Sequence, residues 1–295
     1  MERKNGIDAF GAGALVAFAL FLAVNQIIIK MVNAGLQPVF FAGMRSLIAA
    51  VALWAWMRWR GRPMRLTRDM AGPGIAVGLV FGFEFLFMFL ALDLTTVTRT
   101  AVLLYSMPVW MALAAHFLLP GERLRPMRVA GLALAFLGVA LALTDRAAGG
   151  EASLAGDLCA VVAAMCWAGI ALIARASRLS TLRPDMQLYW QVIVSVPLLL
   201  GASVFFGPFI RDLQPVHLAG LAYQGVVVVA AGFAFWLWLL SIYPASGVAS
   251  FAFLTPVFGV ALGWLLLDEP VGPRLFAALV LVAVGIVLIN RPAKA

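Results

Sequence analysis

The chain has 295 residues, of which 64% are hydrophobic and 12% are charged, and its formal net charge is +8. Soluble globular proteins are nearer to about half apolar, so this composition excludes an ordinary soluble enzyme or binding module. The positive charge does not indicate nucleic-acid binding, because the basic residues lie between apolar runs and not on one face.

Apolar runs long enough to cross a bilayer as helices recur along the whole chain. Ten such runs are predicted, at residues 7–33, 38–59, 70–92, 97–119, 125–144, 154–177, 186–207, 214–241, 247–267 and 272–290. The connections are short and leave no room for a separate soluble domain. The first run is too long for a signal peptide and lacks a small-residue cleavage site, so we expect it to remain as the first helix. The sequence predicts an all-α polytopic membrane protein.

The basic residues predict which way the helices run through the membrane. Lys and Arg resist translocation, so connections rich in them stay on the cytoplasmic side. Most of the 21 Lys and Arg residues lie in connections on the same side as the N-terminus. The second connection alone contains Arg58, Arg60, Arg62, Arg65 and Arg68. We therefore expect a bacterial-type inner (plasma) membrane protein with both termini in the cytoplasm.

Two stretches of the chain, residues 103–124 and 251–271, are similar to each other. Each is an apolar run with an internal proline that ends in an acidic turn. The matching residues are Pro108 and Pro256 in the runs, and Glu122 and Glu269 in the turns. The spacing of the two copies is about half of the chain, which predicts an internal duplication.

The duplication divides the ten predicted helices into two repeats, an N-terminal one at residues 1–147 and a C-terminal one at residues 148–295. Together they would form a single membrane domain. An odd number of helices in each repeat makes the second copy insert in the opposite direction. The sequence therefore predicts ten transmembrane helices as two inverted five-helix repeats, an arrangement typical of secondary transporters.

The end of each half has a proline-containing helix, a short turn with Glu and a glycine-spaced helix. The residues are Pro108, Gly121, Glu122, Gly131 and Gly138 in the first copy, and Pro256, Glu269, Pro270 and Gly285 in the second. With Arg45 in the second helix, this pattern resembles the drug/metabolite transporter superfamily and, within it, the ten-helix EamA family. One departure is Ala278, which stands where the first copy has Gly131.

That resemblance implies a five-plus-five inverted fold that exports small metabolites by alternating access. It also implies a central cavity lined by helices one, three, four, six, eight and nine. The many aromatic residues are most similar to the YddG-type members of the family, exporters of aromatic and other amphipathic amino acids. The expected partners are a small-molecule substrate and the lipid bilayer, with no nucleic acid, and a fused pair of halves would function as a monomer.

Arg45 and Glu84 lie well inside predicted helices, where a charge is costly and usually faces a partner or a polar cavity. At the rise of an α-helix, both lie roughly 10–14 Å below the outer surface. Two interpretations remain open. In the first, Arg45 and Glu84 form an ion pair that joins the second and third helices. In the second, Glu84 binds a substrate amine or a proton, and Arg45 binds a substrate carboxylate.

A further set of residues is predicted to contribute to a central binding site. The polar members are Asn25, Gln26, Tyr105, Ser106, Gln224 and Ser250, and the aromatic members of an apolar wall are Phe81, Trp167 and Phe253. Interhelical hydrogen bonding and core packing are the alternative for each of them. Pro108 and Pro256 are either static kinks or a pair of hinges that let each half rock during transport.

Signatures of enzymes, metal sites and cofactor sites are missing from the sequence, so we expect no enzyme activity, no metal and no cofactor. Cys159 and Cys166 lie in one predicted helix without a metal-ligand spacing and are interpreted as packing residues. Two alternatives to a carrier remain open. One is an intramembrane enzyme acting on a lipid or lipid-linked substrate, and the other is a passive channel.

Overall fold

A computed structural model describes residues 7–64, 66–118, 126–144, 153–243, 251 and 253–290. This part of the chain is helical, and its extended pairing is limited to one isolated bridge between Leu36 and Ile210. Eight of its helical segments are long and apolar enough to cross a membrane, and two shorter apolar helices follow near the C-terminus. The prediction of an α-helical membrane protein is confirmed.

The first half of the chain forms six helices. They are α1 (Ala9–Gly35), α2 (Pro38–Trp59), α3 (Arg68–Leu94), α4 (Val97–Leu104), α5 (Met107–Leu118) and α6 (Pro126–Thr144). The second half contains α7 (Leu154–Ala176), the 3-10 turn η1 (Arg178–Thr181), α8 (Pro184–Ser203), α9 (Pro215–Ala222), the π-helical η2 (Tyr223–Gly232), α10 (Phe233–Ile242), α12 (Leu254–Leu267) and α13 (Pro273–Asn290). Since α9, η2 and α10 follow one another without a break, they form one long helical segment.

Side-chain caps and prolines fix where several helices begin. The Asp8 carboxylate accepts a hydrogen bond from the Gly11 amide at 2.8 Å, and the Ser153 hydroxyl accepts one from Gly156 at 3.0 Å. These bonds satisfy amides that have no partner within the helix. Pro38 and Pro184 occupy the first positions of α2 and α8, where a missing N–H costs nothing.

The predicted fourth span is broken into α4 and α5 just before Pro108. α4 ends at Leu104 and α5 begins at Met107, so Tyr105 and Ser106 lie in a turn between them. Pro108 has no N–H, so it cannot make the helical hydrogen bond to the carbonyl four residues earlier. In the turn before it, the Ser106 amide donates to the Leu103 carbonyl, three residues earlier, at 3.2 Å. In the second half, Pro256 lies in the first turn of α12. The structure therefore has a helix break or start at both prolines.

Helices at equivalent positions of the two halves pack antiparallel to each other. The start of α2 meets the end of α8, where the Gln37 side chain donates to the Ser203 carbonyl at 2.7 Å. The end of α2 meets the start of α8, where Arg62 bonds to Asp185 at 2.8 Å. α6 and α13 also run antiparallel, because Gly131 near the start of α6 lies against Gly285 near the end of α13.

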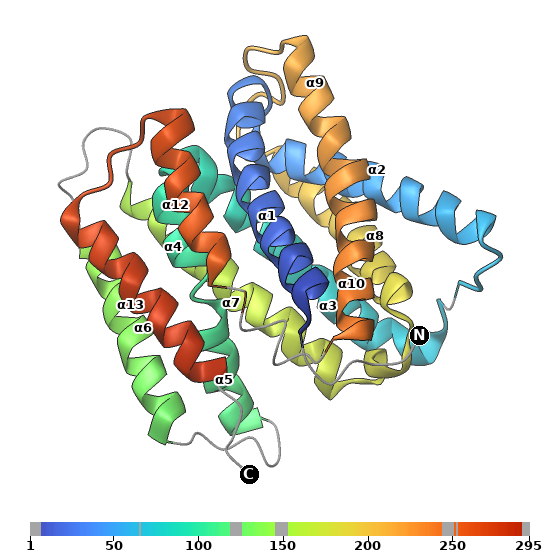
Figure 1. Ribbon diagram of the computed structural model, residues 1–295. Helices are drawn as coiled ribbons and strands as arrows, with labels where there is room; N and C mark the ends of the chain where they lie inside the picture. Colours follow the sequence, from blue (N-terminus) through green and yellow to red (C-terminus); the bar gives the residue numbers. More distant parts are fainter. Residues whose placement is uncertain are drawn as a thin grey trace.

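The packed helices form one bundle in which elements of both halves alternate. Figure 1 shows α6 and α13 together on one side, α2, α8 and α10 on the other, and α1 between them at the front. Three glycines of α3, each four residues after the last, form a packing surface, since a Cβ at Gly74, Gly78 or Gly82 would lie 2.4–2.5 Å from a side chain of α8.

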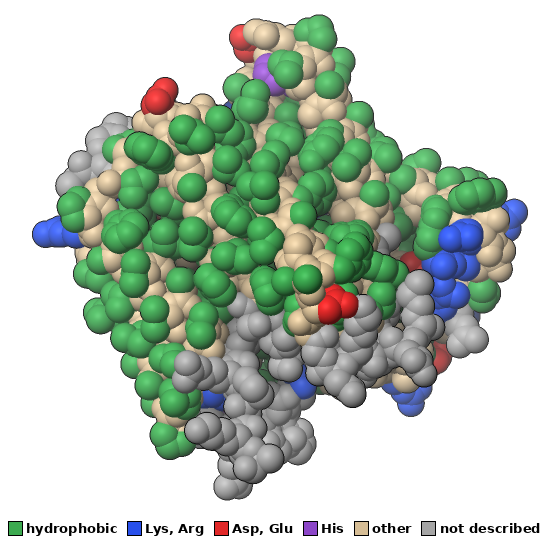
Figure 2. Space-filling model, in the orientation of Figure 1, with side chains coloured by type: hydrophobic (Ala, Val, Ile, Leu, Met, Phe, Trp, Pro, Cys, Tyr) green, Lys and Arg blue, Asp and Glu red, His purple; other side chains and the backbone are tan. Residues whose placement is uncertain are grey.

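Hydrophobic side chains cover most of the visible face of the molecule, and charged side chains gather near its edges (Figure 2). Large apolar residues stay exposed along several helices, among them Phe10, Leu20, Val51, Val226 and Phe276. An apolar surface of this extent is unfavourable in water and favourable in lipid. It agrees with a protein that lies in a membrane.

Candidate functional site

A cavity of about 630 Å³ lies at the centre of the bundle, between the two halves. Most of its wall comes from α1, α3, the α4–α5 break, α5, α7, α8, the η2–α10 segment and α12, and α2, α6 and α13 contribute Arg45, Arg128 and Ile289. At one end it reaches the exposed residues Arg175 and Pro184, and at the other it stops at the buried Gln26, Met88 and Leu104. We call these the open end, where α1 begins, and the closed end, where α1 finishes.

Most of the cavity wall is apolar and aromatic. Tyr105 and Trp167 meet edge to face with ring centroids 5.5 Å apart, and Phe18 stacks on Trp236 at 5.0 Å. Phe81, which is 2% exposed, lies on the same wall. An aromatic lining of this kind suits a ligand with an apolar side chain or ring.

Arg45 and Glu84 bring charge into this apolar surrounding, and both line the cavity while being only 1% and 6% exposed. The Arg45 guanidinium lies over the Phe85 ring, with Cζ 3.7 Å from the ring centroid. Its Nε and Nη2 atoms have no hydrogen-bond partner among the described residues. A buried guanidinium with unused donors is costly unless a ligand pairs with it.

The predicted Arg45–Glu84 ion pair is not a direct contact in the described part of the chain. The two charges attract each other across the cavity, but no hydrogen bond or salt bridge within 4 Å joins them. The reason is local, because the guanidinium stacks on Phe85, the neighbour of Glu84 in α3. That Arg45 and Glu84 bind a ligand between them stays a prediction.

The uncharged polar residues divide into two groups. Asn25 and Gln26 line the cavity from α1, and the Oε1 atom of Gln26 has no partner among the described residues. Gln224 is fully buried outside the cavity, and its amide donates to the Asn25 side chain. Gln224 therefore lies behind Asn25 and off the cavity wall, and a direct contact between Gln224 and a ligand stays a prediction. Gln187 and Gln191 of α8 and Thr255 of α12 add further polar side chains to the wall.

Of the remaining predicted site residues, Pro108 alone lines the cavity in the described part of the chain. Ser106 is buried in the α4–α5 turn, where it donates to the Leu103 carbonyl and accepts from Trp110. Phe253 packs against a core cluster that includes residues of α4, α12 and α13, and it is not among the residues that line the cavity. Pro108 lines the cavity and Pro256 is buried in α12. Ser250 lies outside the described residues.

Sequence reasoning missed a buried ion pair at the closed end. Arg99, near the start of α4, is 1% exposed and bonds at 2.6 Å to the fully buried Asp157 side chain. Thr95 donates to the same carboxylate at 2.9 Å, and Arg99 also donates to the Ala142 carbonyl. Arg99 and Asp157 both lie in the first turn of a helix, one in each half of the chain. The sequence could have predicted this pair only from two opposite charges at the same depth in the two halves.

Charged residues near the rim of both ends are more exposed. Arg211, in the connection before α9, bonds to Asp93 at 2.6 Å, and this hydrogen bond raises the pKa of the Arg211 guanidinium. At the open end, Arg62 bonds to Asp185, and Arg128 and Arg175 line the mouth of the cavity. These residues place positive charge around the entrance.

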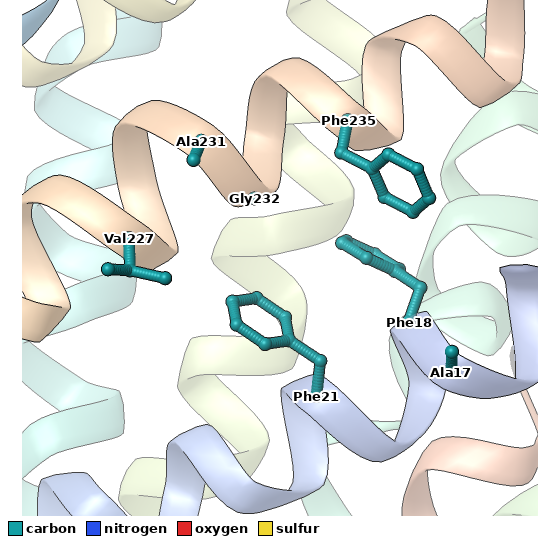
Figure 3. A pocket seen from close by; sticks show the side chains of 7 residues that line it. All are labelled: Ala17, Phe18, Phe21, Val227, Ala231, Gly232 and Phe235. Atoms are coloured by element: carbon teal, nitrogen blue, oxygen red, sulfur yellow. The ribbon is translucent and has the colours of Figure 1, made fainter.

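A second, smaller groove of about 290 Å³ lies on the outside of the bundle between α1 and the η2–α10 segment (Figure 3). Phe18 and Phe21 project into it from α1, opposite Val227, Gly232 and Phe235. Phe18 also lines the central cavity, so one ring separates the groove from the cavity. All its side chains are apolar, which fits a surface that faces lipid tails.

A comparison with protein-family models finds the EamA-like transporter family twice in this chain, at residues 9–144 and 154–291. A solved crystal structure superposes on the chain with a TM-score of 0.65, covering 94% of this chain and 96% of that one. Its sequence is 23% identical, so this likeness shows the fold alone.

Relatives among known proteins match nearly the full length. The "Probable amino-acid metabolite efflux pump" of Escherichia coli is 25% identical over 97% of this chain and 94% of its own. The "Uncharacterized transporter YoaV" of Bacillus subtilis is 23% identical over 92% of this chain and 94% of its own. The "Uncharacterized protein PA1977" of Pseudomonas aeruginosa is 30% identical over 95% and 92%.

Proposed function

This chain belongs to the EamA-like transporter family, and from that premise we propose that it exports small amphipathic metabolites, with amino acids, aromatic ones included, as the leading substrates. Membership of a transporter family also bears out the prediction that the chain is not an enzyme. Two of its relatives are named as amino-acid metabolite efflux pumps, which supports the choice of substrate.

The observation that carries the proposal is the buried Arg45 guanidinium, whose Nε and Nη2 find no hydrogen-bond partner among the described residues, in an aromatic cavity that also contains Glu84. An amino acid has a carboxylate for Arg45 and an ammonium group for Glu84. Its side chain would then lie against aromatic residues such as Trp167 and Phe81. The charges of a zwitterion would balance those of the cavity, so the bound complex would bury no net charge.

We infer ten transmembrane helices in two inverted repeats, with a boundary between residues 147 and 148. The antiparallel packing of α2 on α8, and of α6 on α13, supports this inference, because parallel copies would not pair end to start. With both termini in the cytoplasm, the open end faces the cytoplasm of a bacterial-type inner membrane. The described state is then the inward-open state of an alternating-access cycle, and the transport unit is a monomer.

Counterflow in liposomes tests the proposal. Purified protein is reconstituted, the vesicles are preloaded with one unlabelled amino acid at a time, and labelled phenylalanine is added outside. Transient accumulation that saturates is expected for a carrier, whereas a passive channel gives no accumulation above equilibrium. Flat traces with every preload would contradict amino-acid transport.

Substrate analogues test the role of Arg45. Phenethylamine lacks the carboxylate of phenylalanine, so the normal protein should bind it about 10- to 150-fold more weakly, as expected for a hydrogen bond to a charged group. In Arg45→Gln this difference should largely disappear. Arg128→Gln is the matched control, because it removes the same charge from the mouth of the same cavity. An Arg45→Gln protein that still prefers phenylalanine to the same degree would remove Arg45 from the binding site.

A further inference from the structure

The turn after α12 brings Glu269 back against its own helix. Asp268 takes a left-handed conformation with φ 51°, and the Glu269 amide then bonds to the Gly263 carbonyl at 3.2 Å. As a result the Glu269 side chain points into the bundle and is only 4% exposed. A carboxylate at a chain turn is normally exposed to water, so its burial requires specific partners.

Those partners are at the start of α4, in the other half of the molecule. The Val97 amide donates to Oε1 of Glu269 and the Thr98 amide donates to Oε2, both at 2.7 Å. These amides belong to the first turn of α4 and have no partner within that helix. A carboxylate there is stabilised both by the two hydrogen bonds and by the helix dipole.

α4 and α12 touch from this turn down to the closed end of the cavity. A Cβ at Gly263 would lie 2.6 Å from the Glu269 carboxylate and 2.8 Å from the Thr98 side chain. One turn deeper, a Cβ at Gly259 would lie 2.6 Å from Cβ of Ala101. Leu104 and Gln26, where the cavity stops, come next. The α4–α12 contact therefore closes the cavity on this side.

We propose that Glu269 is the positioning residue that holds α4 and α12 together at the closed end, and that its release from the Val97 and Thr98 amides is a step of the transport cycle. This inference rests on the proposed function. Arg99–Asp157 also crosses the halves, but its separation would leave two buried charges unpaired. Glu269 and its partners are also buried, but water can take over both sides of these bonds once the end opens, because the partners are amides of the first helical turn and not a second buried charge.

Accessibility of a cysteine in the cavity tests the proposal without any substrate. Ala19→Cys places a thiol on the cavity wall of α1 in a chain that also has Cys159→Ala and Cys166→Ala. A membrane-impermeant maleimide is added to right-side-out and inside-out vesicles. In the parent protein the faster side identifies the open end. In Glu269→Gln, labelling from the other side should become at least tenfold faster, and labelling from the open-end side should slow.

Asp268→Asn is the matched control, because it removes the same charge one residue away and Asn tolerates the left-handed conformation. It should label like the parent. Parent-like labelling of Glu269→Gln would overturn the proposal, and so would faster labelling from both sides together with a lower melting temperature, which indicates general loosening. If Glu269→Gln does not accumulate, Gly263→Ala carries the same expectation, because its methyl group displaces the carboxylate. Because labelling needs no substrate, a negative counterflow result would leave this outcome interpretable.

Discussion

The two ends of the central cavity use charged residues in different ways. At the closed end, Arg99 and Asp157 are almost fully buried and bond across the halves, and Glu269 is buried against α4. At the open end, the Arg62–Asp185 pair also crosses the halves, but its side chains are 27% and 12% exposed. Burial removes water as a competing partner, so loss of one member is costly at the closed end and cheap at the open end.

This difference explains how one end can be shut while the other is accessible. The proposed alternating-access cycle requires interactions of different strength at the two ends of the cavity in any one state. In the described state the closed end has the buried charge pairs, and the open end has exposed arginines around the mouth, such as Arg175. Substitutions at the two ends should therefore have unequal effects.

The largest effect is expected from Asp157→Ala, which leaves the Arg99 guanidinium buried without its carboxylate. Such a change costs about 3–5 kcal/mol of the free energy of unfolding. The measurement is denaturant-induced unfolding in mixed micelles. A double variant, Arg99→Met with Asp157→Leu, should recover most of the loss, since no buried charge remains. A loss below about 1 kcal/mol in Asp157→Ala would show that the closed end does not depend on this pair.

An intermediate effect is expected from Pro108→Ala combined with Pro256→Ala. Both prolines lie at a break or a start of a helix, and the hinge hypothesis predicts that the helices bend there during the proposed cycle. Alanine supplies the N–H that proline lacks, so each helix can become more continuous and stiffer at this point. If bending there limits turnover, counterflow should slow about tenfold. The single variants serve as controls and should each slow it less. Turnover at the normal rate in the double variant would rule out the hinges.

The smallest effect is expected from Arg62→Gln at the open end. A partly exposed ion pair contributes about 0–1 kcal/mol, and salt screens it. The change in unfolding free energy should be within that range at low salt and should vanish at about 1 M salt. Arg211→Gln is the matched comparison at the rim of the closed end, because the Arg211 and Asp93 side chains are 36% and 18% exposed. Its loss of unfolding free energy should be as small as that of Arg62→Gln. If Arg62→Gln lowered the free energy of unfolding as much as Asp157→Ala does, the contrast between the two ends would be wrong.

The spans were predictable because each depends mainly on residues near one another in the sequence. Pro38–Trp59 is a helix with the predicted bounds, and most other helices begin and end within a few residues of those expected. The interruption at Pro108 was also predictable, because proline lacks the donor that a continuous helix needs. The π-helical stretch at 223–232 was not, since its sequence is as apolar as an ordinary span.

The site was only partly predictable. Arg45, Glu84 and Asn25 could be singled out because polar residues are rare inside apolar runs, and they do line the cavity. Gln224 is likewise a polar residue inside an apolar run, but it lies behind Asn25. Only the packing of the helices shows which of these two residues lines the cavity. Glu269 looked like an ordinary turn residue, because nothing near it in the sequence indicates a partner in α4.

The sequence by itself determined that this protein lies in a membrane, where its helices run and which transporter family it belongs to. Those properties follow from apolar runs that satisfy their backbone hydrogen bonds locally, and from a pattern repeated in both halves. Only the tertiary structure decided which charges are buried together, which polar residues face the cavity and which end of it is closed. The reason is that the partners involved, such as Glu269 and Val97, are brought together by the packing of helices from different halves.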